Sequence, residues 1–382
     1  MKKINVGVIG GGFIGPVHVE SLRRLGNVDV VAIATSNEEG AKKLAEQLCI
    51  PKAYGDYQAL IQDEQVQAVH ICTPNYLHYP MAKAAILAGK HVVCDKPLAM
   101  TAAQGEELRQ LASRQGVVAA VSFNLRFYPL IHQIKAMVQA GELGEIYAIN
   151  GSYQQDWLQL PQDYSWRLEP EQAGEARAIG DIGSHWLDGV EFMTGLKIEE
   201  VCADFATFLP VRKKPKKAMQ TFSGKLLKNE DYEDVQITTE DYASVLLHFA
   251  GGAHGSLTVN QAAAGRKNRL FYEIYGSKAG VCFNGEKPNQ LWIGKRTGNN
   301  ELIIKDPALV LPSSREIMSY PGGHAEGFGD TFKQCFKRIY AYISGGQQGG
   351  ILFPTFADGV RELKISEAIV TSAKKRAWEM VQ

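Results

Sequence analysis

The sequence predicts a doubly wound α/β domain at residues 1–124, followed at residues 125–382 by an α+β domain with a large, mostly antiparallel open sheet. Two observations support this prediction. The first part alternates short, almost continuously apolar runs with helix-like segments, which is the pattern of a parallel sheet buried on both faces. The second part has longer runs separated by glycines, as antiparallel hairpins require.

In the first domain, short apolar runs predict strands at 4–10, 28–35, 66–73, 90–95 and 117–123. Helical spacing of apolar residues predicts helices at 14–25, 38–48, 76–88 and 102–115. An open α/β sheet of this kind binds ligands at the carboxyl edge of its strands. We therefore look for the functional residues of this domain where its strands end.

In the second domain, the predicted strands lie at 145–155, 197–209, 238–249, 253–260, 269–276, 279–283 and 289–295. Gly251, Gly252, Gly276 and Gly280 fall between neighbouring runs, where hairpin turns are expected. Helical patterns return at 325–344 and 358–378. The open sheet offers a surface on which a homo-oligomer, a dimer or a tetramer, can form.

The composition indicates a small molecule or another protein as the partner, with no role for nucleic acid or membrane. The 41 basic residues balance the 41 acidic residues, so the chain has no net charge to attract phosphate-rich partners. The basic cluster VRKKPKK at 211–217 is interpreted as a solvated loop.

We expect a cytoplasmic protein. The start MKKINVGVIG lacks the apolar stretch of a secretion signal, and no run approaches the ~18 apolar residues that span a bilayer. The six cysteines show no Cys-x-x-Cys spacing, and we expect them to be reduced and buried.

The stretch VGVIGGGFIGPVH contains the Gly-x-Gly-x-x-Gly motif of a dinucleotide-binding turn. Gly10 permits the tight turn, Gly12 lets the backbone approach a pyrophosphate, and Gly15 allows the helix to pack closely on the strand. Together with Phe13 and Ile14, they open a helix whose free N–H groups can hold the anion. The motif therefore predicts an NAD or NADP site.

Two further strand ends carry candidate cofactor contacts. The second strand ends in Thr35 and Ser36, without an acidic residue to hold the ribose or repel a 2′-phosphate, so NAD and NADP both stay possible, with NAD slightly favoured. The stretch CTPNYLH offers further contacts at the same edge, from Thr73, Pro74, Asn75 and His78. A capped helix that starts after Pro74 explains these residues equally well.

The stretch HVVCDKPLAM, residues 91–100, ends an apolar strand in a charged pair. Asp95 and Lys96 are either a solvated strand end or reactive groups held on a rigid support. Pro97 prevents regular strand pairing from continuing and helps to turn the chain outward.

The stretch GDIGSHWLD places an acid and a histidine at the start of a predicted helix. If the helix begins near Gly183, Asp181 lies just before its first turn and His185 lies inside that turn, so both side chains can face one cleft. An Asp in this place is most often an N-cap, and a lone His is more often structural. Asp188, one turn later, is interpreted equally well as a structural partner.

Weaker candidates come from three other segments. The stretch YQQDWLQLPQDYSWR has the glutamine and aromatic side chains that bind sugars, although aromatic residues in a strand are by default core or interface. The candidates for substrate or cofactor contact are Gln155, Trp157, Asn124, Tyr128 and His324, the last near Glu326 at a glycine-rich helix start. The spacing of His and Cys predicts no metal site, and a Gly-x-Ser-x-Gly hydrolase turn is missing.

The glycine motif, CTPNYLH, CDKP and GDIGSHWLD together resemble the Gfo/Idh/MocA oxidoreductases, which include glucose-fructose oxidoreductase and inositol dehydrogenase. The order and spacing of these motifs agree over nearly the whole chain. The resemblance implies a Rossmann domain, followed by a large open sheet that carries the substrate site and often the oligomer contact.

The resemblance also implies roles for the site residues. Lys96 matches the lysine of a Glu-Lys-Pro tripeptide that lies beside the nicotinamide and the substrate hydroxyl, with Asp95 in place of the glutamate. His185 would be the general base in oxidation, and Asp181 would bind a substrate hydroxyl or orient the imidazole.

The function implied is an NAD(P)-dependent dehydrogenase that acts on a secondary hydroxyl of a cyclic sugar, sugar derivative or inositol-like polyol. An ammonium at Lys96 can stabilise the charge that grows on the substrate oxygen. Trp166 and Arg167 match a pair of the family that can reach the cofactor. Two alternatives stay open, namely a glucose-fructose-type enzyme that retains its nucleotide and a nucleotide-sensing regulatory protein without catalysis.

Overall fold

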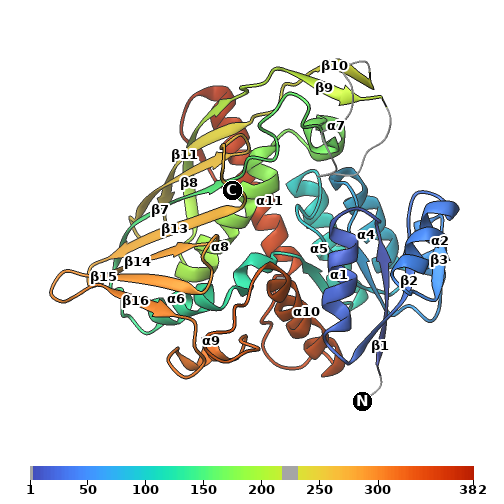
Figure 1. The fold of residues 1–382 in the computed structure, drawn as a ribbon, viewed down its shortest axis with the longest axis horizontal. Helices are drawn as coiled ribbons and strands as arrows, with labels where there is room; N and C mark the ends of the chain where they lie inside the picture. The colour runs from blue at the N-terminus through green and yellow to red at the C-terminus, as the bar shows by residue number, and fades with distance from the viewer. Residues whose placement is uncertain (1–2, 217–230) are drawn as a thin grey trace. The chain divides into compact units, whose positions relative to one another are not determined.

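The computed structural model describes residues 3–216 and 231–382, which form two compact units (Figure 1). The first unit consists of the chain up to Asn124 together with Glu171–Gly174 and Gly329–Leu363, and the second unit comprises the other described residues. From the predicted basic loop at 211–217, Lys217 lies outside the described residues, as do Met1 and Lys2.

The first unit contains, among its described residues, a six-stranded parallel sheet of order β3-β2-β1-β4-β5-β6. Its strands are β1 (Ile4–Ile9), β2 (Val28–Ala34), β3 (Lys52–Tyr54), β4 (Ala68–Ile71), β5 (His91–Cys94) and β6 (Ala119–Val121). The predicted doubly wound α/β fold is confirmed, and every residue of β4 is buried, as a strand covered on both faces must be. Strand β3 was not predicted, because a three-residue strand shows no period.

The helices of this unit begin and end where the local sequence favours it. They are α1 (Ile14–Arg23), α2 (Glu38–Gln47), α3 (Tyr57–Gln62), η1 (Asn75–Leu77), α4 (His78–Leu87) and α5 (Ala102–Gln115). The side chains of Asn37, Asp56 and Thr101 accept backbone N–H bonds at the starts of α2, α3 and α5. Gly116, with φ of 65°, ends α5 in the left-handed conformation.

Residues from the far end of the chain complete the first unit. They include most of α10 (Phe328–Ser344) and the first part of α11 (Phe356–Lys375). The ring of Phe336 lies 4.7 Å from His18 of α1 and 4.8 Å from His70 of β4. The core under the parallel sheet is therefore closed by side chains that lie more than half the sequence away.

The second unit is built on a sheet of order β16-β15-β14-β13-β7-β12-β11-β8-β17 among its described residues. The strands are β7 (Ile146–Gln154), β8 (Ile198–Ala206), β11 (Tyr242–Phe249), β12 (His254–Asn260), β13 (Arg269–Gly276), β14 (Ala279–Asn284), β15 (Gln290–Lys295), β16 (Glu301–Ile304) and β17 (Glu379–Met380). Among these described strands, only the pairing of β12 with β7 is parallel, so the prediction of a mostly antiparallel sheet is confirmed.

Helices α6 (Pro129–Gln139) and α8 (Ser184–Thr194) contact one face of this sheet (Figure 1). Short helical segments in the same unit are η3 (Trp166–Leu168), η4 (Ile179–Gly183) and α9 (Pro312–Arg315), whereas η2 (Asn124–Phe127) begins with the last residue of the first segment of the first unit, and α7 (Pro170–Ala173) belongs mostly to the first unit. Along β11, Val245 and Leu247 are buried while Leu246 between them is 53 % exposed. This alternation gives the sheet one face in the core and one open face.

Several local predictions need correction. The segment at 211–217 is not a loop over its described part, because β9 (Val211–Pro215) pairs with β10 (Tyr232–Gln236). Arg212 within it is fully buried. Gly251 and Gly252 do form a hairpin turn with positive φ, but Gly280 lies inside β14.

The cysteines are free, as expected, but only Cys72, Cys94 and Cys335 are buried, whereas Cys49 is exposed. In the part of the chain that the structure describes, no helix combines the length and apolar character needed to cross a membrane.

Candidate functional site

The glycine turn after β1 has the shape that a pyrophosphate requires. Gly10 has φ of 113°, and a Cβ there would lie 2.3 Å from the Cys72 carbonyl oxygen. A Cβ on Gly15 would lie 2.1 Å from the Gly10 carbonyl oxygen, so this glycine allows the close packing of α1. A Cβ on Gly12, in contrast, would meet nothing within 4 Å, so the backbone there faces open space.

The N-terminus of α1 is open to an anion. Phe13 stands at its N-cap without a side-chain capping bond, and no acidic residue occupies the first turn, which includes Ile14. The side chain of Phe13 is 52 % exposed. Uncapped N–H groups and the positive end of the helix dipole suit a phosphate, so the turn fits the group that the sequence predicts.

The end of β2 lies beside this turn. A Cβ on Gly11 would lie 3.1 Å from the methyl carbon of Thr35. The Thr35 hydroxyl donates to the Asn37 carbonyl oxygen at 2.9 Å, whereas Ser36 is exposed. Of Thr35 and Ser36, Ser36 is therefore the residue whose replacement should disturb the turn less.

A helix does start after Pro74 at the end of β4, as the alternative interpretation expected, but it has no side-chain cap. The helix starts as the short turn η1, with Pro74 at its N-cap and no side-chain capping bond. Asn75 is mostly buried and donates to the Ala173 carbonyl oxygen at 2.8 Å. Thr73 is partly exposed, and its hydroxyl lies 3.7 Å from the Met81 sulfur.

His78 holds the ends of β4 and β5 together. Its Nδ1 lies 2.6 Å from the Pro97 carbonyl oxygen and its Nε2 lies 2.9 Å from the Thr73 carbonyl oxygen. Burial lowers the pKa of His78, although both carbonyl contacts oppose this shift. With both ring nitrogens engaged inside the protein, His78 positions the loop of Lys96.

Asp95 and Lys96 follow β5 at the same edge. The backbone N–H of Asp95 donates to the Ile71 carbonyl oxygen at 2.9 Å, and the Asp95 carboxylate accepts from the Lys96 backbone N–H at 2.9 Å. Both residues are partly exposed, and the peptide bond between Lys96 and Pro97 is cis. The lysine thus lies on a short, anchored loop, as a rigid support for chemistry requires.

Asn124, after β6, is buried, and its side-chain amide donates to the Thr331 hydroxyl at 2.7 Å. The parallel sheet therefore brings the predicted cofactor residues of this unit to the carboxyl ends of β1, β2, β4, β5 and β6. The direction of strand order changes between β1 and β4, which is where such sheets bind nucleotides.

In the second unit, Asp181 lies inside a helical turn and not before one. The π-helical turn η4 runs directly into α8, and the Asp181 backbone N–H donates to the Arg177 carbonyl oxygen at 2.8 Å. The alternative interpretation of Asp181 as an N-cap is therefore wrong, although α8 does begin next to Gly183, as expected. The Asp181 carboxylate accepts from Arg167 Nε at 3.0 Å and from Gln261 Nε2 at 2.8 Å.

His185 lies one turn further along, near the N-terminus of α8. The ring of Tyr153 on β7 has its centroid 6.3 Å from that of His185. The Tyr272 hydroxyl donates to the His185 carbonyl oxygen at 3.2 Å and so anchors this turn of α8 to β13. Strand and helix thus fix the backbone that carries the histidine.

The Gln and Trp candidates lie in one polar and aromatic group. Trp157 Nε1 donates to Gln155 Oε1 at 2.8 Å, and Gln155 Nε2 donates to Asn268 Oδ1 at 2.8 Å. The Arg167 guanidinium lies over Trp166, 4.5 Å from the ring centroid, and 5.7 Å from that of Trp157. Arg167 therefore links this group to the Asp181 carboxylate.

The remaining candidates lie in other surroundings. Tyr128 is buried in the core of the second unit, 5.7 Å from Phe283 between ring centroids, and burial raises its pKa to about 12. His324 is exposed, with Nδ1 3.2 Å from the Gly322 carbonyl oxygen. Glu326 is buried against Lys305 at 2.9 Å, and Asp188 pairs with Arg126. These two acids are structural partners.

Gln261 was not among the predicted residues, although it is fully buried directly after β12 and contacts Asp181. A polar residue at the end of an apolar strand is the signal that was available, in the stretch TVNQ.

Residues 4–123 match the family described as "Oxidoreductase family, NAD-binding Rossmann fold", and residues 131–282 match the "GFO/IDH/MocA C-terminal domain". Levoglucosan dehydrogenase of Pseudarthrobacter phenanthrenivorans is 30% identical over 99% of this chain and 98% of its own length. The chain belongs to the Gfo/Idh/MocA oxidoreductase family.

Solved structures of Gfo/Idh/MocA proteins agree with this membership. A levoglucosan dehydrogenase in complex with NADH and L-sorbose matches this chain with a TM-score of 0.89 at 29% sequence identity. The match covers 100% of both chains. An inositol dehydrogenase homolog from Azotobacter vinelandii with NAD+ has a TM-score of 0.87 at 26% identity, over 99% of this chain and 97% of that one. The first unit of this Gfo/Idh/MocA chain thus contains an NAD-binding Rossmann domain.

Proposed function

We propose that this oxidoreductase oxidises a secondary hydroxyl of a cyclic sugar, sugar derivative or inositol-like polyol with NAD or NADP. One observation carries the proposal: an acid, a histidine and amide and indole groups gather in the second unit, at Asp181, His185, Gln155 and Trp157. Such groups suit a ligand with several hydroxyls and an apolar ring face. In this proposal, residues 1–124 bind the nucleotide and residues 125–382 the substrate.

In this proposal, the cofactor binds to residues of the first unit. The turn of Gly10, Gly12 and Gly15 holds the pyrophosphate, and the ends of β2, β4 and β5 hold the two nucleoside halves. Bound NAD supplies a hydride acceptor. The Asp95 carboxylate and the Thr73 hydroxyl offer polar contacts to the nicotinamide half.

Lys96 and His185 act on the substrate hydroxyl. The Lys96 ammonium donates to the substrate oxygen and stabilises the negative charge that grows on it as the C–H bond breaks. His185 accepts the hydroxyl proton as general base. Asp181 accepts a bond from a neighbouring substrate hydroxyl, in an orientation set by Arg167 and Gln261.

The first test needs no guess about the substrate. Thermal unfolding with NADH and with NADPH at matched concentrations should show a raised midpoint for the preferred nucleotide, because a ligand that binds only the folded state stabilises it. Levoglucosan, myo-inositol and a panel of pyranoses are then screened for NADH formation at 340 nm. Nucleotide binding without turnover on any of them contradicts the dehydrogenase and favours the regulatory alternative.

A nucleotide that stays with the protein through dilution, and is released only on denaturation, favours the glucose-fructose-type alternative. The readout is absorbance of the protein-free filtrate before and after denaturation. For a dehydrogenase that exchanges its cofactor, the expected result is release on dilution.

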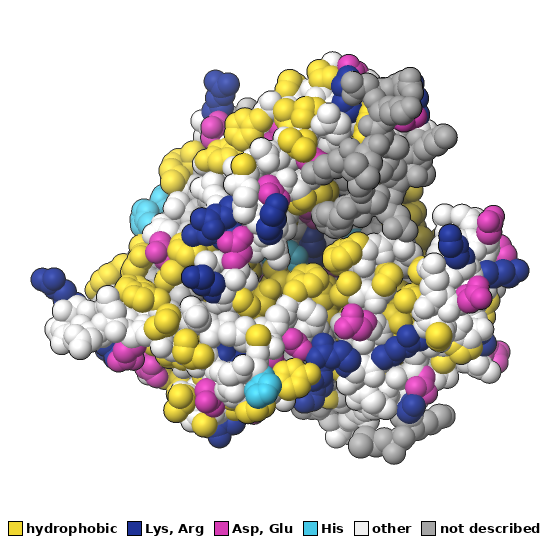
Figure 2. All heavy atoms as spheres, in the orientation of Figure 1, with side chains coloured by type: hydrophobic (Ala, Val, Ile, Leu, Met, Phe, Trp, Pro, Cys, Tyr) yellow, Lys and Arg dark blue, Asp and Glu magenta, His cyan; other side chains and the backbone are white. Residues whose placement is uncertain are grey.

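We also propose that the chain forms a homo-oligomer through the open face of its large sheet. Cross-strand register places Trp292, Leu246 and Cys202 in one row on this face, together with polar residues. Figure 2 shows hydrophobic side chains over the strands of this sheet. Light scattering should give a dimer or tetramer, and Leu246→Glu should reduce its mass to that of a monomer.

We further propose that the protein acts in the cytoplasm, which its free thiols support. Fractionation of the native cells with an antibody against the chain tests this, and recovery outside the cytoplasm contradicts it.

A further inference from the structure

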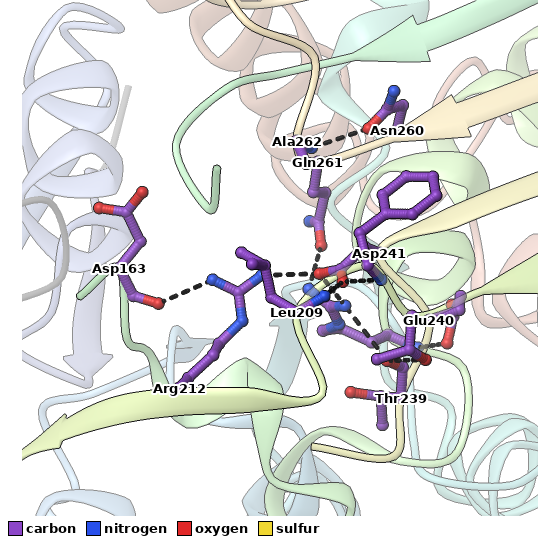
Figure 3. A network of polar contacts seen from close by, with 12 residues as sticks. Asp163, Leu209, Arg212, Thr239, Glu240, Asp241, Asn260, Gln261 and Ala262 are labelled. Atoms are coloured by element: carbon purple, nitrogen blue, oxygen red, sulfur yellow. Dashed lines mark hydrogen bonds and ion pairs between the residues drawn. The ribbon is translucent and has the colours of Figure 1, made fainter. Parts of the chain in front are cut away.

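A fully buried ionic group of Arg177, Arg212 and Asp241 lies in the second unit (Figure 3). Arg177 and Arg212 both donate to Oδ1 of Asp241, at 2.5 and 2.7 Å, and the side chains of all three are inaccessible to solvent. The other oxygen, Oδ2, accepts the backbone N–H groups of Phe208 and Leu209 at 2.8 and 3.0 Å. Asp241 is therefore fixed from both sides.

This group is held in the ionised state. Burial alone would raise the pKa of Asp241, but the charges of Arg177 and Arg212 and the hydrogen bonds to the carboxylate hold it below its usual value. Such a buried group is costly to assemble and stabilises little compared with apolar side chains. Since stability alone does not account for this buried ionic group, we look for its role in its connection to Asp181, the acid of the proposed site.

Gln261 connects the buried group to Asp181. Its Oε1 accepts from Arg177 Nη1 at 3.4 Å, and its Nε2 donates to Asp181 Oδ2 at 2.8 Å. Its backbone N–H donates to the Asp241 carbonyl oxygen at 3.0 Å. Because a guanidinium can only donate, the Gln261 oxygen must face Arg177, and the amide nitrogen must face Asp181.

We propose that Gln261, oriented by Arg177, is a positioning residue that presents the Asp181 carboxylate to the substrate hydroxyl. This inference rests on the proposed function for its catalytic consequence. Because Arg177 fixes the orientation of the Gln261 amide, the amide nitrogen always faces Asp181 and donates to it. This hydrogen bond holds one oxygen of the Asp181 carboxylate in place. Arg167 Nε fixes the other oxygen at 3.0 Å. The carboxylate thus has a fixed plane, as recognition of a hydroxyl requires.

The main variant is Gln261→Glu, which keeps the size of the side chain and an oxygen for Arg177. The atom that faces Asp181 then changes from a donor into an acceptor. In a crystal structure of the variant, the Asp181 carboxylate should move by about 1 Å or more from its wild-type position. An unmoved carboxylate overturns the proposal. Gln261→Met, which has neither donor nor acceptor, gives the same test if the glutamate variant fails to fold.

The kinetic arm uses a double-mutant cycle on the best sugar substrate. We expect Gln261→Glu to lower kcat/KM at least about tenfold, with the KM for the nucleotide unchanged, and Asp181→Asn to lower it further. The double variant should be no slower than Asp181→Asn alone, because Gln261 acts through Asp181. Losses that multiply mean that Gln261 acts independently, and they overturn the proposal.

The matched control is Gln133→Met. Gln133 is a buried glutamine of the same unit, on α6, whose side-chain oxygen accepts the Leu311 N–H at 2.9 Å. Its replacement should cost stability but leave kcat/KM unchanged. An equal activity loss in this variant would show that the loss at Gln261 is structural and would overturn the proposal. If the wild type oxidises no sugar, the proposed function fails, and the crystal structures still decide whether Gln261 positions Asp181.

Discussion

The Nδ1 atoms of His18 and His70 lie 2.9 Å apart in the interior of the first unit. Only one proton fits between two such nitrogens, so one ring donates and the other accepts. Cys72 Sγ lies 3.2 Å from His18 Nδ1, and the Tyr340 hydroxyl lies 2.8 Å from His70 Nε2. Asp95 is the nearby charge that favours protonation of His18, but burial outweighs it and lowers the pKa to about 4.

This histidine pair should make folding stability sensitive to acid. Burial, and then the proximity of His18, also lower the pKa of His70 well below 6.5. Above pH 6.5 both rings are neutral in the folded and unfolded chain. Between pH 6.5 and 4 the unfolded chain binds protons that the folded protein excludes, so His18 lowers the free energy of unfolding by about 2 kcal/mol at pH 5, and His70 lowers it further.

Urea unfolding of wild type and His18→Gln at pH 7.5, 6 and 5 measures this effect. The variant should lose the part of the pH dependence that His18 contributes, whatever its stability at pH 7.5. His248→Gln, on the open face of the sheet, is the control and should keep the wild-type slope. An unchanged slope in His18→Gln would show that other groups cause the acid sensitivity.

The glycines of the turn should separate folding from nucleotide binding. Gly12→Ala leaves the free energy of unfolding within about 0.5 kcal/mol of wild type, because the added Cβ meets nothing within 4 Å. It should weaken NADH binding at least tenfold, since the methyl group occupies space that the pyrophosphate needs. Gly10→Ala should instead lower stability by about 3 kcal/mol or more, because of its positive φ and the Cys72 oxygen. Urea unfolding and NADH fluorescence titration measure both effects, and equal NADH affinity in Gly12→Ala contradicts the assignment.

Replacement of Lys96 by Met should lower kcat by roughly 100-fold or more, because the donor to the developing negative charge is lost. The Kd for NADH should change by less than about twofold, since the proposed pyrophosphate site is the glycine turn and does not include Lys96. Lys83→Met is the control, because Lys83 pairs with Glu107 on the helices of the same unit. Unchanged turnover in Lys96→Met excludes the proposed role.

Ser36→Arg should shift the preference toward NADPH by about tenfold, measured as the ratio of the two KM values. Ser36 is exposed at the carboxyl end of β2, and a guanidinium there can pair with a 2′-phosphate. Ser36→Gln has a similar reach without the charge and should leave the ratio near that of wild type. A shift of the same size in both variants would mean that size, and not charge, sets the preference.

The sequence predicted those site residues that lie at the ends of regular apolar strands. Lys96 and the glycine turn stand out as candidates because a buried parallel strand leaves a continuous apolar run, and a charged residue or a group of glycines is conspicuous directly after it. For the same reason, the predicted bounds of β1 and β2 are close to the observed bounds.

The remaining parts depend on contacts between distant segments. Arg212 was interpreted as part of a solvated loop because its partner, Asp241, is 29 residues away, and no local pattern shows a buried ion pair. The π-helical turn that carries Asp181 was missed because the periodicity of apolar residues does not distinguish it from the start of α8. Gln261 gains its meaning only from the contact with Asp181 across 80 residues.

The first unit is assembled from segments that lie far apart in the sequence, and this has a consequence for synthesis on the ribosome. Its parallel sheet is complete after β6, yet Phe336 and Tyr340, which cover the buried histidines, are translated more than 200 residues later. Until then the nascent sheet exposes apolar surface and two histidine rings to water. A chaperone that holds the emerging chain should therefore raise the yield of folded protein, and a fragment ending near residue 124 should aggregate when expressed alone.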